Sequence, residues 1–141
     1  MISTLLINMK IDPKLHHYCQ NITKGNLDLV VEMYKLFKFK VVYTPPAKDW
    51  IMVGQDEPRF AIQIIQVDDA PIEDINKKRQ THIAFLSDNP QGIIDEIKKW
   101  AEGKGLKFRE GGWSAIERYF DLPDIFVNFV VEVMHTSIEG E

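Results

Sequence analysis

The sequence has a single cysteine, Cys19, in 141 residues, so no disulfide can form within the chain. It also has no apolar run long enough to cross a membrane. The apolar stretch in MISTLLINMKIDP, at its start, is too short for the core of a secretory signal, and no basic residue precedes it. These features predict a protein of a reducing compartment, and we expect a cytoplasmic location.

The sequence also lacks a cluster of charges of one sign. Its 17 lysines and arginines are interleaved with 21 aspartates and glutamates, which gives a formal net charge of −4. A nucleic-acid-binding protein usually carries a basic patch, and a helix that lies on a membrane usually carries a basic face. We therefore expect neither nucleic acid nor a membrane as a partner.

Hydrophobic residues make up 45% of the chain, enough to bury the core of one ordinary domain. Strand and helix patterns follow one another in the same order twice. The first half, residues 14–67, has expected strands at 15–22, 39–43, 50–54 and 60–67, and a helix that begins near residue 26 or 28. The second half, residues 81–135, has expected strands at 81–86, 106–110, 115–120 and 126–134, and a helix that begins at residue 90.

Three segments lie outside these halves: an N-terminal extension (1–13), a charged connector nearly devoid of large apolar residues (68–80) and a C-terminal tail (136–141). The helix of the second half has clear start signals, because Asn89 suits the cap and Pro90 suits the first position. A Pro-rich turn is expected at 44–46 and a Gly-rich turn at 110–112. Each half thus has the order strand, helix, strand, strand, strand, which predicts one α+β domain.

The two halves match locally as well as in their order. HYCQN (17–21) corresponds to HIAFL (82–86), and each stretch precedes a helix. FAIQII (60–65) corresponds to FVVEVM (129–134), and each stretch closes its half. Each half therefore carries one polar residue on its first strand and one on its last, at similar separations. The four residues are His17, Gln63, His82 and Glu132.

Polar side chains on strands of Ile, Val, Phe and Ala are costly to bury without a partner. The simplest common partner for the four residues is a metal ion. Two imidazoles, an amide oxygen and a carboxylate form a donor set that suits Zn, Ni, Co, Mn or Fe. The alternative is that each side chain is hydrogen-bonded separately or faces solvent on a sheet with one wet side.

Either of two neighbouring histidines fits the first position of this set. His16 and His17 would face opposite sides of a strand. The match with HIAFL favours His17, which would then share its face with Cys19 and Asn21. Cys19 would either contact a substrate or be a small buried thiol of the core.

Further candidates for a pocket come from the third expected strand of each half. Trp50 and Met52 alternate on that strand in the first half, and Trp113 and Arg118 lie around it in the second. Arg118 would either bind a carboxylate or phosphate of the substrate through two hydrogen bonds or be a surface residue on a strand of mixed charge.

With these residues in place, the chain resembles the vicinal oxygen chelate superfamily over roughly residues 14–135. That superfamily contains glyoxalase I, extradiol dioxygenases, methylmalonyl-CoA epimerase, and the fosfomycin and bleomycin resistance proteins. The resemblance implies paired βαβββ modules whose mixed sheets curl around a cup. It also implies a divalent metal held by His17, Gln63, His82 and Glu132, with Glu132 as a catalytic residue.

The resemblance implies a small-molecule substrate and a homodimer, in which the modules pair within one chain or between two chains. Gln63 replaces a glutamate that glyoxalase I usually has, and MYKLFKF (33–39) lacks the glycine that often follows the first helix. The function expected is a metal-dependent lyase or isomerase that acts through an enolate. The alternatives are a metal-free binding or resistance protein and an extradiol-type ring-cleaving dioxygenase.

Overall fold

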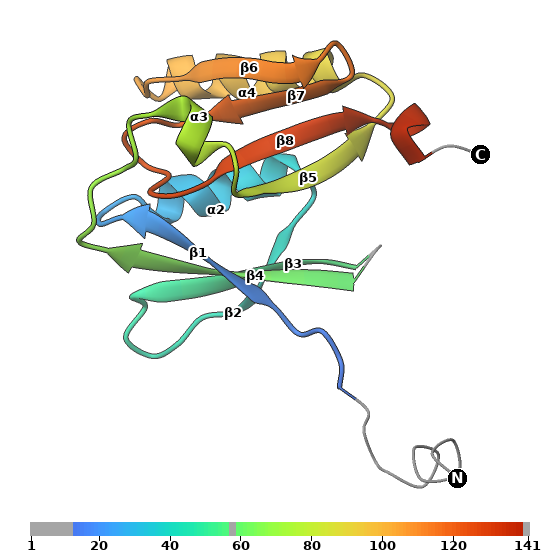
Figure 1. The fold of residues 1–141 in the computed structure, drawn as a ribbon. Coiled ribbons are helices and arrows are strands. Elements are labelled where there is room, and N and C mark those ends of the chain that lie inside the picture. Colours follow the sequence, from blue (N-terminus) through green and yellow to red (C-terminus); the bar gives the residue numbers. More distant parts are fainter. Residues whose placement is uncertain (1–12, 57–58, 140–141) are drawn as a thin grey trace, which may run out of the picture.

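The computed structural model of the protein describes residues 13–56 and 59–139, which form two separate four-stranded sheets (Figure 1). The first half contains β1 (Tyr18–Thr23), α2 (Leu27–Leu36), β2 (Lys40–Tyr43), β3 (Trp50–Asp56) and β4 (Arg59–Val67). The second half contains β5 (His82–Ser87), α4 (Pro90–Gly103), β6 (Arg109–Ser114), β7 (Glu117–Asp121) and β8 (Val130–His135). A short helix, α3 (Ile75–Lys78), lies between the halves, and a 3₁₀ turn (Thr136–Glu139) follows β8.

Both sheets have the same topology. Their strand orders are β1-β4-β3-β2 and β5-β8-β7-β6, and the first strand of each half pairs in parallel with the last. The other neighbours are antiparallel. The predicted α+β fold of two βαβββ modules is therefore confirmed. Neither sheet closes on itself, so each has one face against the core and one face turned away from it.

The two helices form where their apolar side chains recur with helical spacing. In α2, Val30, Met33 and Tyr34 are fully buried, as the periodic pattern predicts. In α4, the side chain of Asn89 accepts a hydrogen bond of 3.1 Å from the backbone N–H of Gly92, and Pro90 occupies the first turn. The predicted cap of this helix is confirmed.

One hydrophobic core joins the two halves. The rings of Phe37, after α2, and Phe85, on β5, stack with their centres 4.3 Å apart. The indole N–H of Trp100 on α4 donates a hydrogen bond of 2.9 Å to Glu32 on α2. Backbone contacts add to this, because β1 bonds to the segment that precedes β8 through Ile22 and Phe126.

Three sequence predictions about strands need correction. The expected strand at 15–22 begins only at Tyr18, so both candidate histidines precede it. The expected turn at 110–112 is wrong: Gly111 and Gly112 lie inside β6, and the turn follows at 115–116. A Cβ on Gly111 would lie 2.5 Å from the hydroxyl of Tyr119, so the glycine serves a close approach between strands and not a turn. The last strand begins at Val130 rather than at residue 126.

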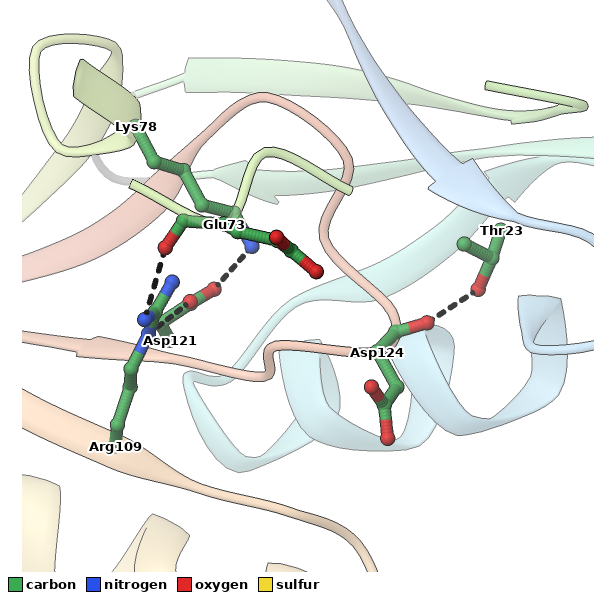
Figure 2. A network of polar contacts seen from close by, with 6 residues as sticks. All are labelled: Thr23, Glu73, Lys78, Arg109, Asp121 and Asp124. Carbon is green, nitrogen blue, oxygen red and sulfur yellow. Dashed lines mark hydrogen bonds and ion pairs between the residues drawn. The ribbon is translucent and has the colours of Figure 1, made fainter. Parts of the chain in front are cut away.

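The connector is more ordered than its composition suggests. Lys78 and Asp121 are both 0% exposed, and their Nζ and Oδ1 atoms lie 2.8 Å apart, close enough for an ion pair. The Nε of Arg109 donates to the other carboxylate oxygen at 2.8 Å, and its Nη1 donates to the carbonyl of Glu73 at 3.2 Å. Figure 2 shows both cations directed at the one carboxylate. The connector and α3 are thereby fixed to β6 and β7.

Most of the expected N-terminal extension, residues 1–12, lies outside the described residues. In the part of the chain that the structure describes, none of the helices has the length and apolarity needed to span a membrane.

Candidate functional site

The second sheet brings together two of the four predicted ligands. His82 is the first residue of β5, and Glu132 lies on β8, which pairs with β5 in parallel. In the register of this pair Glu132 lies opposite Ala84, and His82 shares a face with Ala84 because side chains alternate along a strand. The Nε2 of His82 is 3.1 Å from a carboxylate oxygen of Glu132. This face is turned away from the core residues Val131 and Val133.

The hydrogen bond of the other ring nitrogen of His82 determines which nitrogen carries the proton. Its Nδ1 lies 2.8 Å from the backbone carbonyl oxygen of Arg79, and because a carbonyl only accepts, Nδ1 carries the proton. The Nε2 of a neutral imidazole then presents a lone pair toward the carboxylate of Glu132. Two acceptors so close to each other need a proton or a cation between them. A histidine that ligates a metal is commonly held by the same second hydrogen bond.

Glu132 lies in surroundings that disfavour its charge. It is 4% exposed, and this burial raises the pKa of its carboxyl group above the usual value. The nearby carboxylate of Glu117 also raises this pKa, whereas His82 lowers it. A cation between His82 and Glu132 would remove much of the cost of burying this carboxylate.

Aromatic side chains and one arginine surround the pair. The ring of Trp113 lies 5.0 Å from that of His82 and 5.3 Å from that of Tyr119. The guanidinium carbon of Arg79 lies 5.4 Å from the Trp113 ring centre and 5.9 Å from that of Tyr119. The site on the second sheet thus combines a histidine, a buried carboxyl group and a cation on an aromatic surface.

The first sheet holds the other predicted residues on one face. Gln63 on β4 lies directly between Cys19 on β1 and Met52 on β3. Asn21 and Trp50 lie on the same face, each opposite Ile65. The intervening residues of β4, among them Ile62 and Ile64, are fully buried against the core.

His16 and His17 precede β1 and are both exposed, with their Nδ1 atoms 2.7 Å apart. The structure therefore leaves open which of the two would act with Gln63. Within residues 13–56 and 59–139 there is no group of three or more His, Cys, Asp or Glu side chains placed to hold a metal ion. One chain brings His82 and Glu132 together on the second sheet, whereas Gln63 lies on the first sheet and His17 lies just before its first strand. The four-residue site therefore stays a prediction.

A groove of about 1090 Å³ lies along the first sheet. Met52, Gly54 and Ala61 line it on β3 and β4, and the segment of residues 14–16 lines it ahead of β1. All the residues that line it belong to the first half of the chain. The groove therefore does not include the His82–Glu132 pair.

The two predicted pocket residues of the second half, Trp113 and Arg118, have different surroundings. Trp113 contacts His82. Arg118 lies opposite Val133 and therefore on the other face of the sheet from Glu132. Its Nε is buried and makes no hydrogen bond to any residue of the described ranges.

Sequence reasoning missed Arg79 as a residue of this site. Arg79 lies in the charged connector, in which the sequence predicts no functional residue because residues 68–80 contain almost no large apolar side chains. The signal that was available is Asp74, whose side chain accepts from the N–H of Asn76 at 3.0 Å and caps α3. Arg79 follows this helix directly and reaches the aromatic side chains.

Comparison with known proteins adds information on the fold. Neither a protein-family model nor a curated protein sequence matches the chain. Among solved structures, the fosfomycin resistance protein FosX from Mesorhizobium loti matches with a TM-score of 0.56 and 16% identity, over 92% of this chain and 97% of that one. A mutant of FosX from Listeria monocytogenes, complexed with Mn(II) and 1S,2S-dihydroxypropylphosphonic acid, matches with a TM-score of 0.59 and 18% identity, over 92% and 96%.

A third solved structure, a possible glyoxalase from Bacillus cereus, matches with a TM-score of 0.56 and 14% identity, over 87% of this chain and 99% of that one. The chain has the glyoxalase fold. These solved structures are of proteins of the vicinal oxygen chelate superfamily, so the resemblance seen in the sequence is confirmed for the fold. The identities are low, and the glyoxalase fold hosts several reactions, so the chemistry must be argued from the site itself.

Proposed function

We propose that this protein is a divalent-metal-dependent lyase or isomerase that acts on a small metabolite through an enolate. The observation that carries the proposal is the pair of His82 and Glu132, with Nε2 and a carboxylate oxygen 3.1 Å apart and Nδ1 held by a backbone carbonyl. That arrangement leaves one nitrogen and one oxygen donor facing each other on the face of the second sheet that is turned away from the core.

The chemistry of these donors fits a transition metal. Imidazole nitrogen and carboxylate oxygen suit Zn, Ni, Co, Mn and Fe, and the hydrogen bond to the Arg79 carbonyl is the kind of support that ligating histidines have. His17 and Gln63 would complete the set, and His16 is the alternative to His17. When bound, the metal would supply Lewis-acid stabilisation of negative charge on two neighbouring substrate oxygens.

The protein's own residues would do the rest. Glu132, whose pKa is raised by burial, is the residue we assign to moving a proton, because a carboxyl group of raised pKa both takes up and releases a proton more readily near neutral pH. Trp113 and Tyr119 would cover the site and keep water from it. Cys19, Asn21, Trp50 and Met52 would line the opposite side.

The complete site needs the two sheets to face each other across a cup. In one chain the predicted ligands lie on separate sheets, and each sheet presents its ligand-bearing face away from the shared core. We therefore propose a homodimer in which His82 and Glu132 of one chain meet His17 and Gln63 of the other.

The test is the metal content of untagged protein prepared without chelators. We expect about one equivalent of a divalent transition metal per chain in the wild type, and a loss of most of it in Glu132→Ala and His82→Ala. The matched control is His135→Ala, because His135 bonds Ser137 and lies on the opposite face of β8 from Glu132. Parallel His16→Ala and His17→Ala variants decide between these neighbours.

A second candidate function is supported by the observation that one chain brings only two of the four predicted ligands together. On that basis a metal-free binding or resistance protein of the same fold is the alternative. Wild-type protein that contains no metal and takes up none on addition would favour it and contradict the enzyme proposal. Iron as the bound metal would instead direct the search to ring-cleaving oxygenation.

A further inference from the structure

Arg79 is held over two aromatic rings beside the His82–Glu132 pair. Its guanidinium lies 5.4 Å from the ring centre of Trp113 and 5.9 Å from that of Tyr119. Its backbone carbonyl accepts the hydrogen bond from the Nδ1 of His82. The residue that fixes the orientation of the imidazole therefore also brings a positive charge to the same face of the sheet.

The guanidinium of Arg79 makes no hydrogen bond and no ion pair with any residue in the described ranges. This contrasts with Arg109, whose guanidinium bonds both Asp121 and the carbonyl of Glu73. A cation–π contact uses the charge of the guanidinium and leaves its N–H donors without an acceptor. An arginine in this state has its paired donors available for an oxyanion.

The backbone beneath Arg79 is fixed, so its position is defined. Lys78, the preceding residue, is completely buried and directed at Asp121 at the end of β7 (Figure 2). The connector is further held by the N–H of Ile72, which donates to the carbonyl of Val127 at 2.8 Å. Adjacent residues at a helix end point in different directions, so the anchor of Lys78 leaves Arg79 directed at the aromatic rings.

We propose that Arg79 is the subsite for an oxyanion group of the substrate, a carboxylate, phosphate or phosphonate that lies next to the carbon atoms that react. This inference rests on the proposed function, since it names the class of substrate that the same site would take. An oxyanion on this face needs a positive charge beside Glu132, because an ionised Glu132 would repel it, and the guanidinium of Arg79 over Trp113 supplies that charge. Arg79 is a binding and positioning residue in this scheme, and Glu132 remains the residue that moves a proton.

The test uses the full chain, freed of metal by dialysis against a chelator, and two probes, inorganic phosphate and acetate, at constant ionic strength. Two-dimensional NMR follows the indole N–H of Trp113 and the backbone amides of residues 79–82. Four proteins are compared: the wild type, Arg79→Gln, Arg79→Lys, and Lys107→Gln as a control. Lys107 is 75% exposed and pairs with Asp124 on the surface, so this variant removes the same charge elsewhere.

We expect saturable shifts centred on Trp113 in the wild type, and a rise in the Kd of at least about tenfold in Arg79→Gln. Lys107→Gln should stay within about twofold of the wild type. Arg79→Lys should recover part of the affinity, because it restores the charge without the paired donors. Tighter binding of phosphate would assign a tetrahedral anion, and tighter binding of acetate a carboxylate, and either result supports the subsite.

Equal binding by the wild type and Arg79→Gln, or shifts that do not saturate around Trp113, would overturn the inference. Arg79→Gln should fold as the wild type does, since its side chain bonds no described residue, and circular dichroism checks this. The titration is carried out without metal, so its outcome is separate from that of the metal analysis. A protein that binds no metal but loses phosphate binding in Arg79→Gln would contradict the proposed function alone.

Discussion

Glu132, the residue to which we assign proton transfer in the proposed function, is buried at a cost to the stability of the fold. Burial raises the pKa of its carboxyl group in the folded protein, so the folded state holds this proton to a higher pH than the unfolded chain does. As the pH rises above about 4.3, the unfolded chain loses the proton first, and the free energy of unfolding falls until the folded-state pKa has been passed. The loss of stability caused by the buried carboxylate of Glu132 is therefore absent in acid and reaches its full size at higher pH.

We therefore expect metal-free Glu132→Gln to match the wild type at about pH 4 and to become progressively more stable than it toward pH 7. Urea unfolding in the presence of a chelator, repeated across this range, measures the difference. Glu96→Gln on the surface of α4 is the control for a change in overall charge. A variant that is less stable than the wild type at pH 7 would show that a positively charged His82 compensates the carboxylate.

At the scale of elements, alternation and helix spacing were enough to predict most of the fold. Gln63 and Glu132 lie on the faces that period-two alternation assigns to them, and α4 begins at the predicted cap. The two glycines of β6 misled the prediction because glycine serves tight turns and close strand contacts alike, and only the position of Tyr119 distinguishes the two uses. The anchor of α3 could not be predicted, because Lys78 and Asp121 are far apart in the sequence and resemble solvated charges.

This anchor gives a prediction about the element that carries Arg79. Lys78→Met leaves the carboxylate of Asp121 buried with Arg109 as its remaining partner, so we expect the free energy of unfolding to fall by about 3 kcal/mol. The double variant Lys78→Met/Asp121→Leu removes both buried charges and should recover most of that loss. Urea unfolding measures both.

The matched control for this prediction is Lys24→Met. Lys24 and Asp68 also form an ion pair, at 2.7 Å, but their side chains are 64% and 85% exposed. Removal of an exposed pair should cost less than about 1 kcal/mol. Equal effects of the two lysine substitutions would mean that burial does not distinguish these pairs, and that α3 is held mainly by its backbone contacts.

At the scale of the whole molecule, the candidate site depends on how the two halves are placed relative to each other. The internal repeat predicts one polar residue on the first strand and one on the last strand of each module, but it says nothing about which sheets face one another. The structure packs both sheets and both helices on one core, with Phe37 against Phe85, and this arrangement separates His17 from His82. Local patterns cannot encode that separation, because it is set by contacts between the halves.

The proposed exchange of half-sites between chains makes a prediction that a site within one chain does not. His17→Ala and His82→Ala should each lose bound metal and activity as homodimers. If the two variants are produced together with different affinity tags that lack histidine, their heterodimer contains one site with both histidines intact and one with neither. We expect this heterodimer to bind about half as much metal as the wild type.

The control is a dimer of two His17→Ala chains that carry the two different tags, since each of its sites lacks one histidine. A site closed within each chain would leave the mixed heterodimer as empty as its parents, because each chain would still lack one ligand. Metal content of the purified heterodimer thus decides between the two assemblies without knowledge of the substrate. Recovery of metal in the mixed heterodimer would also explain why the two sheets of one chain turn their polar faces away from each other. The polar face of each sheet would then meet the polar face of the other sheet in a second chain.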